Sequence, residues 1–377
     1  MTESPGFLLT IAAFLLLLGP LVFVHELGHY LAGRIFGVKA DEFSIGFGRE
    51  LFGVTDRRGT RWKFAMLPLG GYVRFAGDMN AGSQPSSDWL ALPPAERART
   101  FQAKPLWQRA IIVAAGPFVN LALAVLILAG FAMADGDRQT PATVRAVVPS
   151  SAAATAGLQA GDRIVSIDGR AIERFDELVL FVTMRPGERL PMQVVRDGAL
   201  RTLPVTIGER REQDRFGNSF RVGQLGVLSG EQVVVPVSPL EAPRVGIRKT
   251  GDIIRMMADS IWQIISGRRS AEELGGPLRI AQVSGAQLAL GWAEFVGLIA
   301  LISINLGFIN LLPVPMLDGG HLLFYAIEAV RRRPVGARVQ EWAFRGGLAA
   351  ILALMVMVTI NDLGAFGVWR SLAGLIG

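Results

Sequence analysis

Apolar residues dominate four stretches of the chain, and the stretches between them are polar and charged. The apolar stretches cover approximately residues 4–30, 110–134, 295–317 and 346–369. Each approaches or exceeds the roughly 20 residues that a helix needs to cross the hydrocarbon core of a bilayer. The pattern predicts a multi-pass α-helical membrane protein with about four transmembrane helices.

Basic residues mark the orientation of these spans. Lys and Arg are frequent between the first and second spans and again between the third and fourth, whereas residues 1–3 contain neither. Because basic loops stay in the cytoplasm, we expect both termini and residues 135–291 to lie outside it. We also expect the first span to be retained, because Met1-Thr2-Glu3 is acidic and no small-residue cleavage site precedes His25.

Composition narrows the class of protein further. Of the 377 residues, 51% are hydrophobic, which is too apolar for an ordinary soluble domain. There is no cysteine, so disulfides, Cys-ligated zinc and thiol nucleophiles are excluded. The formal charge of +6 comes without a basic face interleaved with aromatic residues, so no nucleic-acid partner is expected.

The polar stretch between the second and third spans predicts an extracytoplasmic α+β domain at residues 141–208. Short β-branched runs bounded by Asp168-Gly169 and Asp197-Gly198 read as strands joined by hairpin turns. Residues 209–292 follow as a linker, in which residues 248–265 have the periodicity of an amphipathic helix. The remaining parts are residues 1–134, with the first two spans, and residues 293–377, with the last two.

The end of the first span carries the clearest candidate chemistry, His25-Glu26-Leu27-Gly28-His29. Positions i and i+4 of a helix share a face, so both imidazoles can reach one Zn²⁺. Glu26 lies beside them and can accept a proton from the attacking water. The pattern indicates a hydrolytic metal site within an apolar segment.

A catalytic zinc site needs a third protein ligand, and the residues leave three candidates. Glu50 lies close downstream, but Gly46-Phe47-Gly48 interrupts any helix there. Asp318 follows the third span, at the same predicted membrane level as the histidines. His321 could be a ligand, a group that hydrogen-bonds a ligand, or an interfacial histidine without a role in the site.

Several motifs together resemble the site-2 protease family of intramembrane zinc proteases. These are H-E-x-x-H on the first span and N-x-x-P-x-P-x-L-D-G beginning at Asn310. A third motif, A-G-L-x-x-G-D-x-I-x-x-I-D-G from Ala156, is similar to PDZ domains of bacterial membrane proteases. The runs Leu69-Gly70-Gly71-Tyr72-Val73 and Gly275-Gly276-Pro277-Leu278-Arg279-Ile280-Ala281 add to the resemblance.

The resemblance implies one Zn²⁺ bound by His25, His29 and Asp318, with Glu26 as the general base. It implies that Asn310 lies near the scissile bond and that Pro313 and Pro315 shape the gap. It also implies that Gly46, Phe47 and Gly48 belong to a cytoplasmic-side re-entrant β-hairpin, which could bind unwound substrate by strand addition.

The implied activity is endopeptidase cleavage of the membrane-spanning segments of single-span proteins. The implied substrates are anti-sigma factors or signal-peptide remnants that another protease has already trimmed. The implied location is a bacterial cytoplasmic (inner) membrane. Similar family members carry two PDZ domains, whereas this chain shows one clear copy, and residues 223–227 are either a remnant or an unrelated strand.

Two other functions remain open at this point. One is a membrane-anchored zincin of the conventional kind, which would cut soluble loops and use Glu50 as its third ligand. The other is a non-catalytic membrane scaffold whose PDZ domain binds partners; it would have no need for His25, Glu26 and His29.

Overall fold

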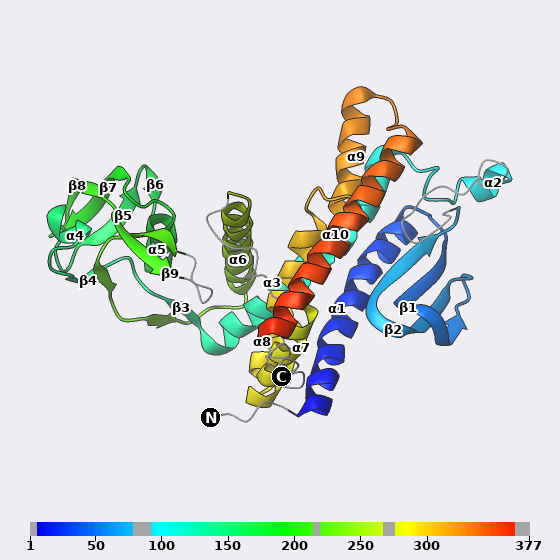
Figure 1. Ribbon diagram of the computed structural model, residues 1–377, viewed down its shortest axis with the longest axis horizontal. Coiled ribbons are helices and arrows are strands. Elements are labelled where there is room, and N and C mark those ends of the chain that lie inside the picture. The colour runs from blue at the N-terminus through cyan, green and yellow to red at the C-terminus, as the bar shows by residue number, and fades with distance from the viewer. Residues whose placement is uncertain (1–5, 78–91, 214–218, 267–275, 366–377) are drawn as a thin grey trace, which may run out of the picture. The chain divides into compact units, whose positions relative to one another are not determined.

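The computed structural model describes residues 6–77, 92–213, 219–266 and 276–365 (Figure 1). The chain forms two compact units, one built from residues 1–128, 246–257 and 271–377, and one from residues 129–245 and 258–270. Among the described residues, four helices are long and apolar enough to cross a membrane, as predicted. They are α1 (Phe7–Ile35), α3 (Leu106–Asp135), α8 (Trp292–Asn310) and the part of α10 (Ala337–Ala365) from Arg338 to Ile360.

The third and fourth apolar helices begin and end elsewhere than predicted. Helix α8 stops at Asn310 rather than at residue 317, because Pro313 and Pro315 cannot supply the backbone N–H groups that would continue it. A further helix, α9 (Asp318–Arg331), follows this break. Helix α10 begins at Ala337, about two and a half turns earlier than predicted, because polar residues can precede the apolar part of one continuous helix.

Small and aliphatic side chains pack the helices of the first unit together. Ala13, Leu17 and Leu21 of α1 are fully buried against Phe295 and Leu298 of α8, with side chains of α7 (Pro277–Leu290) packed on the same cluster. A second cluster joins Ala124 of α3 to Ala300 and Ile304 of α8. Small residues at such contacts allow close helix approach, which favours association within lipid.

A curled β-hairpin lies against α1 and consists of β1 (Ala40–Thr55) and β2 (Arg61–Phe75) (Figure 1). Residues 42–45 pair with 71–74 on one side and with 61–64 on the other, and residues 50–55 pair with 61–65. The spatial order of segments is therefore 71–75, 40–47, 61–67 and 50–55, with the first and last at the two edges. The predicted hairpin is present; its re-entry into a membrane stays a prediction.

Backbone conformation explains the curl. Gly46 and Gly48 have φ of +93° and +88°, a left-handed region that favours glycine. A Cβ at Gly46 would lie 2.8 Å from the carbonyl oxygen of Leu67, so the paired strands also require a residue without a side chain there. Within the same hairpin, Phe43 of β1 is buried and stacks on Trp62 of β2, with ring centroids 4.4 Å apart.

The second unit contains the predicted α+β domain. Its four-stranded sheet has the order β6-β5-β7-β8, and α5 (Phe175–Thr183) contributes Leu178, Phe181 and Val182 to the same buried cluster. The strands of this sheet are β5 (Arg163–Ile167), β6 (Arg170–Ala171), β7 (Arg189–Arg196) and β8 (Ala199–Thr206). The other elements are β3 (Asp137–Gln139), β4 (Val144–Val147), α4 (Ala152–Thr155), β9 (Gly208–Gln213), β10 (Ser219–Gln224), β11 (Val227–Ser229) and β12 (Val233–Val235).

This domain continues past the predicted boundary at residue 208. Strand β11 pairs with β4, and Leu225 is buried in the same cluster as Ile164 and Ile167. Residues 223–227 are therefore part of this domain rather than a remnant of a second one. Outside it, the predicted amphipathic helix is present as α6 (Ala242–Ile265), and the short helix α2 (Pro94–Arg97) precedes α3.

Candidate metal centre

Helix α1 presents His25 and His29 on one face, one turn apart. Their Nε2 atoms lie 3.3 Å from each other, and the two rings meet edge to face. Both side chains are largely withdrawn from solvent, with relative exposures of 10% and 12%. Two neutral imidazoles that direct lone pairs at one point repel each other unless a cation or a hydrogen lies between them.

Asp318 completes this group from the other end of the chain. Its Oδ2 lies 3.2 Å from Nε2 of His25 and 3.5 Å from Nε2 of His29. The residue begins α9, where a helix N-terminus favours negative charge. Gly319 and Gly320 follow, and a Cβ on either would collide with the carbonyl oxygens of the 311–314 segment, so this tight bend sets the position of the carboxylate.

The three ligand atoms fit a tetrahedral metal. With zinc–nitrogen and zinc–oxygen bonds of about 2.0–2.2 Å, neighbouring ligands of a tetrahedron are about 3.3–3.6 Å apart. The observed separations are 3.2, 3.3 and 3.5 Å. Two imidazoles and one carboxylate form a donor set that zinc accepts, and three protein ligands leave a fourth position open. Among the described residues, this is the group of His, Asp and Glu side chains found suitable for a metal.

Helix α3 supplies the far side of the site, which the sequence did not predict. Nδ1 of His29 lies 2.9 Å from the carbonyl oxygen of Ile112, and Nδ1 of His25 lies 3.2 Å from the side-chain amide of Asn120. Between them, Gly116 faces His29 so closely that a Cβ would overlap the ring. The sequence feature that could have predicted this contact is Asn120, a polar residue in an otherwise apolar span, since polar groups at membrane depth usually have a function.

Glu26 lies beside the ligand group, where α1 meets the edge segment 71–75 of β2. A Cβ on Gly71 would lie 3.0 Å from Cγ of Glu26 and 2.8 Å from Cγ1 of Val22. The absence of a side chain at Gly71 therefore lets the strand edge run directly past the carboxylate. The backbone N–H of Val73 donates a hydrogen bond to Glu26, so this strand edge directly contacts a candidate general base.

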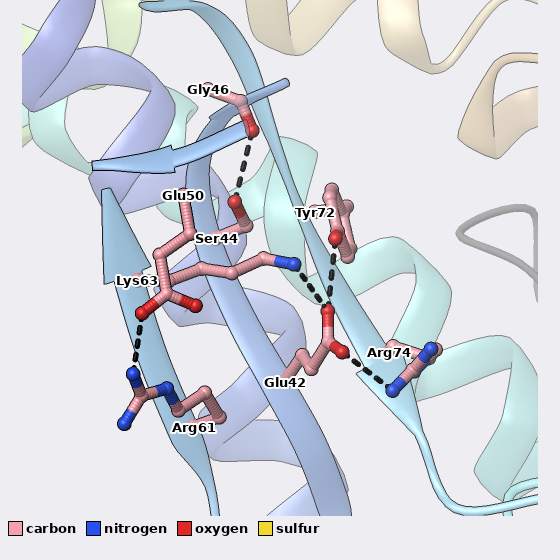
Figure 2. Close-up of polar contacts among 8 residues, drawn as sticks. All are labelled: Glu42, Ser44, Gly46, Glu50, Arg61, Lys63, Tyr72 and Arg74. Atoms are coloured by element: carbon pink, nitrogen blue, oxygen red, sulfur yellow. Dashed lines mark hydrogen bonds and ion pairs between the residues drawn. The ribbon is translucent and has the colours of Figure 1, made fainter. Parts of the chain in front are cut away.

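Glu50, the alternative third ligand, points elsewhere (Figure 2). Its carboxylate pairs with Arg61 within the hairpin, and it does not belong to the group formed with the histidines. A second ion-pair cluster on the hairpin centres on Glu42, which accepts hydrogen bonds from Lys63, Tyr72 and Arg74. Burial raises the pKa of Glu42, but those donors outweigh burial and hold the pKa below its ordinary value.

The other predicted site residues are outside the three-residue ligand group. Asn310 ends α8, and Pro313 and Pro315 form the bend that leads to Asp318. The ring of His321 packs on Phe344 of α10, 5.0 Å between centroids, and is outside the three-residue group. Phe47, between Gly46 and Gly48, is 44% exposed and stacks on Tyr72.

The second unit has a groove of about 270 Å³ beside α5. Apolar side chains of the helix, including Val179 and Val182, line one wall. The segment 222–228 lines the other, and Arg210 adds a basic group. A groove between a helix and a strand suits an extended peptide.

Comparison with known proteins decides the family. A profile of peptidase family M50 matches residues 13–354 of the chain. The chain belongs to peptidase family M50. This confirms the predicted resemblance to site-2 proteases, and the M50 chain is accordingly a metalloprotease. With its four apolar helices, it is a membrane protein.

Relatives of this M50 chain are similar over nearly their full length. The Agrobacterium fabrum protein named "Putative zinc metalloprotease Atu1380" is 46% identical, covering 94% of this chain and 96% of its own. "Metalloprotease MmpA" of Caulobacter vibrioides is 38% identical, covering 98% of this chain and 99% of its own. The chain therefore matches whole proteins rather than a shared domain.

Among solved structures, the PDZ domain of the SdrC-like protein of Listeria monocytogenes matches 24% of the M50 chain and 87% of its own length. The sequence identity is 20% and the TM-score is 0.19. A similarity of this size carries no argument, so the PDZ assignment of residues 141–208 stays a prediction from the sequence motif.

Proposed function

We propose that this chain is an intramembrane zinc endopeptidase that cleaves the membrane-spanning segments of single-span proteins. The observation that carries the proposal is the meeting of His25, His29 and Asp318 at one point. The two histidines lie within α1, whose most apolar window has a mean hydropathy of 2.7. A hydrolytic site built into a helix of this kind reaches peptide bonds at membrane depth.

The donor set supports one zinc ion, with Nε2 of each histidine and Oδ2 of Asp318 as its ligands. Bound there, zinc would supply Lewis-acid chemistry and lower the pKa of water at the open position. Asp318 adds a negative charge next to the two neutral rings. Each histidine must present an Nε2 without a hydrogen in order to bind a metal.

Glu26 would act as the general base. Its carboxylate is adjacent to His25 in the chain and lies at the strand edge of Gly71. From there it can take the proton of the attacking water and deliver it to the leaving amine. Asn310, at the end of α8, and the bend at Pro313 and Pro315 would border the substrate on the side that leads to Asp318.

The hairpin supports a substrate that is unwound before cleavage. A helical segment hides its amides in internal hydrogen bonds, and an unsatisfied amide in lipid costs several kcal/mol. Segment 71–75 is an edge strand of the hairpin, and a substrate strand that pairs with it would replace the lost bonds. Substrates with helix-weakening residues such as Gly or Asn near the cut are therefore preferred over uniformly Leu-rich spans.

The α+β domain would act as a filter ahead of the site. Its groove beside α5 can hold an extended peptide or a new chain end, which suits substrates that another protease has already trimmed. Anti-sigma factors and signal-peptide remnants are substrates of this type. The distribution of Lys and Arg supports an orientation with this domain and both termini outside the cytoplasm, in a protein of the bacterial cytoplasmic membrane.

The test compares the wild-type protein with Glu26→Gln on a single-span model substrate, in detergent and in vesicles, with the new product terminus mapped. The proposal expects a cut inside the span by the wild type and loss of that cut in the variant. A cut confined to a soluble loop would instead favour a conventional membrane-anchored zincin. Absence of any Glu26-dependent cleavage would favour a scaffold.

A further inference from the structure

Asn120 of α3 is a polar residue within the apolar interior of the first unit, and it touches a candidate metal ligand. We propose that Asn120 is a positioning residue for His25. Its amide oxygen accepts a hydrogen bond from Nδ1–H of His25, and this holds the ring with Nε2 directed at the metal. This inference rests on the proposed metal site. It assigns to α3 the orientation of a ligand that α1 provides.

The surroundings of Asn120 favour a specific role over chance packing. The residue is fully buried, and its side-chain nitrogen lies 3.2 Å from Nδ1 of His25. Its side-chain oxygen has no hydrogen-bond partner among the described residues. A buried amide oxygen without a partner is costly, typically about 1–3 kcal/mol, so the amide is expected to be oriented in a way that satisfies it.

The chemistry of the ring determines that orientation. A neutral imidazole carries its hydrogen on one nitrogen only, and Nε2 of His25 must be free of hydrogen to bind a metal. Nδ1 then carries the hydrogen and needs an acceptor. Turning the amide of Asn120 by half a rotation exchanges two atoms of nearly equal size and brings the unpartnered oxygen to Nδ1.

The neighbouring ligand is held in the same manner from the same helix. Nδ1 of His29 lies 2.9 Å from the carbonyl oxygen of Ile112, which can only accept. Ile112, Gly116 and Asn120 are spaced by four residues and so share one face of α3. This face provides an acceptor, a gap for the His29 ring, and a second acceptor. A metal-binding histidine usually donates its other N–H in this way, and losing such a partner typically weakens metal affinity about 10- to 100-fold.

Ser303 provides a matched control. Its hydroxyl is also buried and donates to the backbone carbonyl of Asn120 at 2.8 Å, so it links α8 to the same turn of α3. Its hydroxyl is bonded to the backbone of Asn120 rather than to a histidine ring. Ser303→Ala therefore disturbs the local packing of α3 without removing the acceptor for His25.

The experiment measures the zinc dissociation constant of the full-length purified protein by competition with a chelator. The variants are Asn120→Leu, Asn120→Asp and Ser303→Ala, and thermal unfolding of each metal-free protein serves as a check of folding. We expect Asn120→Leu to bind zinc about 10- to 100-fold more weakly. Asn120→Asp keeps an acceptor and should stay within a few-fold of the wild type, as should Ser303→Ala.

A purely structural role for Asn120 predicts the reverse order, because leucine suits an apolar interior and a buried carboxylate does not. Wild-type affinity in Asn120→Leu, or equal loss in Asn120→Leu and Asn120→Asp, would overturn the inference. Failure of the wild-type protein itself to bind zinc would instead contradict the proposed metal site. The two failures are therefore distinguishable.

Discussion

Oδ2 of Asp318 lies 3.2 Å from Nε2 of His25, although the two residues stand near opposite ends of the chain. Neither residue is held by local structure alone. The histidine comes from the C-terminal half of α1, and the aspartate begins α9, directly after the tight bend that follows α8. The contact makes the site a product of tertiary packing, so changes in the elements that support it should affect metal binding as strongly as changes in the ligands.

Gly116→Ala tests the packing of α3 on the site. A Cβ there would overlap the ring of His29, so we expect zinc affinity to fall about 100-fold, with a matching loss of peptidase activity. Gly130→Ala is the control, because a Cβ at that position of the same helix meets nothing within 4 Å. Equal zinc binding by both variants would show that α3 does not press on the ligand.

The hairpin allows a comparison of two glycines with the same strain. Gly46 and Gly48 both have left-handed φ, so alanine costs about 1–2 kcal/mol at either position. Gly46→Ala also brings a Cβ to 2.8 Å from the carbonyl of Leu67, whereas at Gly48 nothing lies within 4 Å. We therefore expect Gly46→Ala to raise KM for a single-span substrate more than Gly48→Ala does. Equal effects would argue against substrate pairing on an intact hairpin.

Asp362 of α10 caps the start of α7. Its carboxylate oxygens accept hydrogen bonds from the backbone N–H groups of Gly276 and Arg279, with N–O distances of 3.2 and 3.1 Å. Asp362→Ala should destabilise the first turn of α7 by about 1 kcal/mol, seen as faster amide exchange at Gly276 and Arg279. Thr359→Ala, which removes an exposed hydroxyl one turn earlier on α10, should leave that exchange unchanged. Equal exchange in the two variants would contradict the capping role.

The stability of the α+β domain should depend on pH through Asp162. Hydrogen bonds from Arg196 lower the pKa of this carboxyl, and burial opposes them only in part. With a depressed folded-state pKa, the stabilisation is present above the unfolded value of about 3.9 and is lost as pH falls through the folded value. Asp162→Asn should flatten the acid loss of amide protection in β5 and β7.

Asp168→Asn is the control for that measurement, because Asp168 is exposed at a hairpin turn where asparagine is equally well tolerated. This variant should keep the acid dependence of the wild type. The same acid profile in Asp162→Asn would exclude the Asp162–Arg196 pair as its source.

Local patterns in the sequence predicted the three candidate ligands, but they did not predict the residues that contact those ligands. The spacing of His25 and His29 predicted a shared helix face, because that face depends only on helical geometry. The proximity of Asp318 to the histidines was predicted from spans that were expected to end on the same side of a membrane. Asn120 was missed, because its contact with His25 depends on the register between α1 and α3, which no local pattern specifies.

The predicted ends of α8 and of the α+β domain were wrong for a similar reason. The end of α8 at Asn310 depends on Pro313 and Pro315, whereas a hydropathy pattern continues through both prolines. The α+β domain extends beyond residue 208 because β11 pairs with β4, a contact between distant strands. In both cases the boundary was predicted from composition, whereas backbone hydrogen bonding determines where the element ends.

The central claim is that Asp318, rather than Glu50, completes a zinc site with His25 and His29. Zinc content of the purified full-length protein by elemental analysis tests it most directly, in the wild type, Asp318→Ala and Glu50→Ala. The structure predicts one zinc per chain in the wild type and in Glu50→Ala, and loss of most of that zinc in Asp318→Ala. Full zinc content in Asp318→Ala, with loss in Glu50→Ala, would contradict the account.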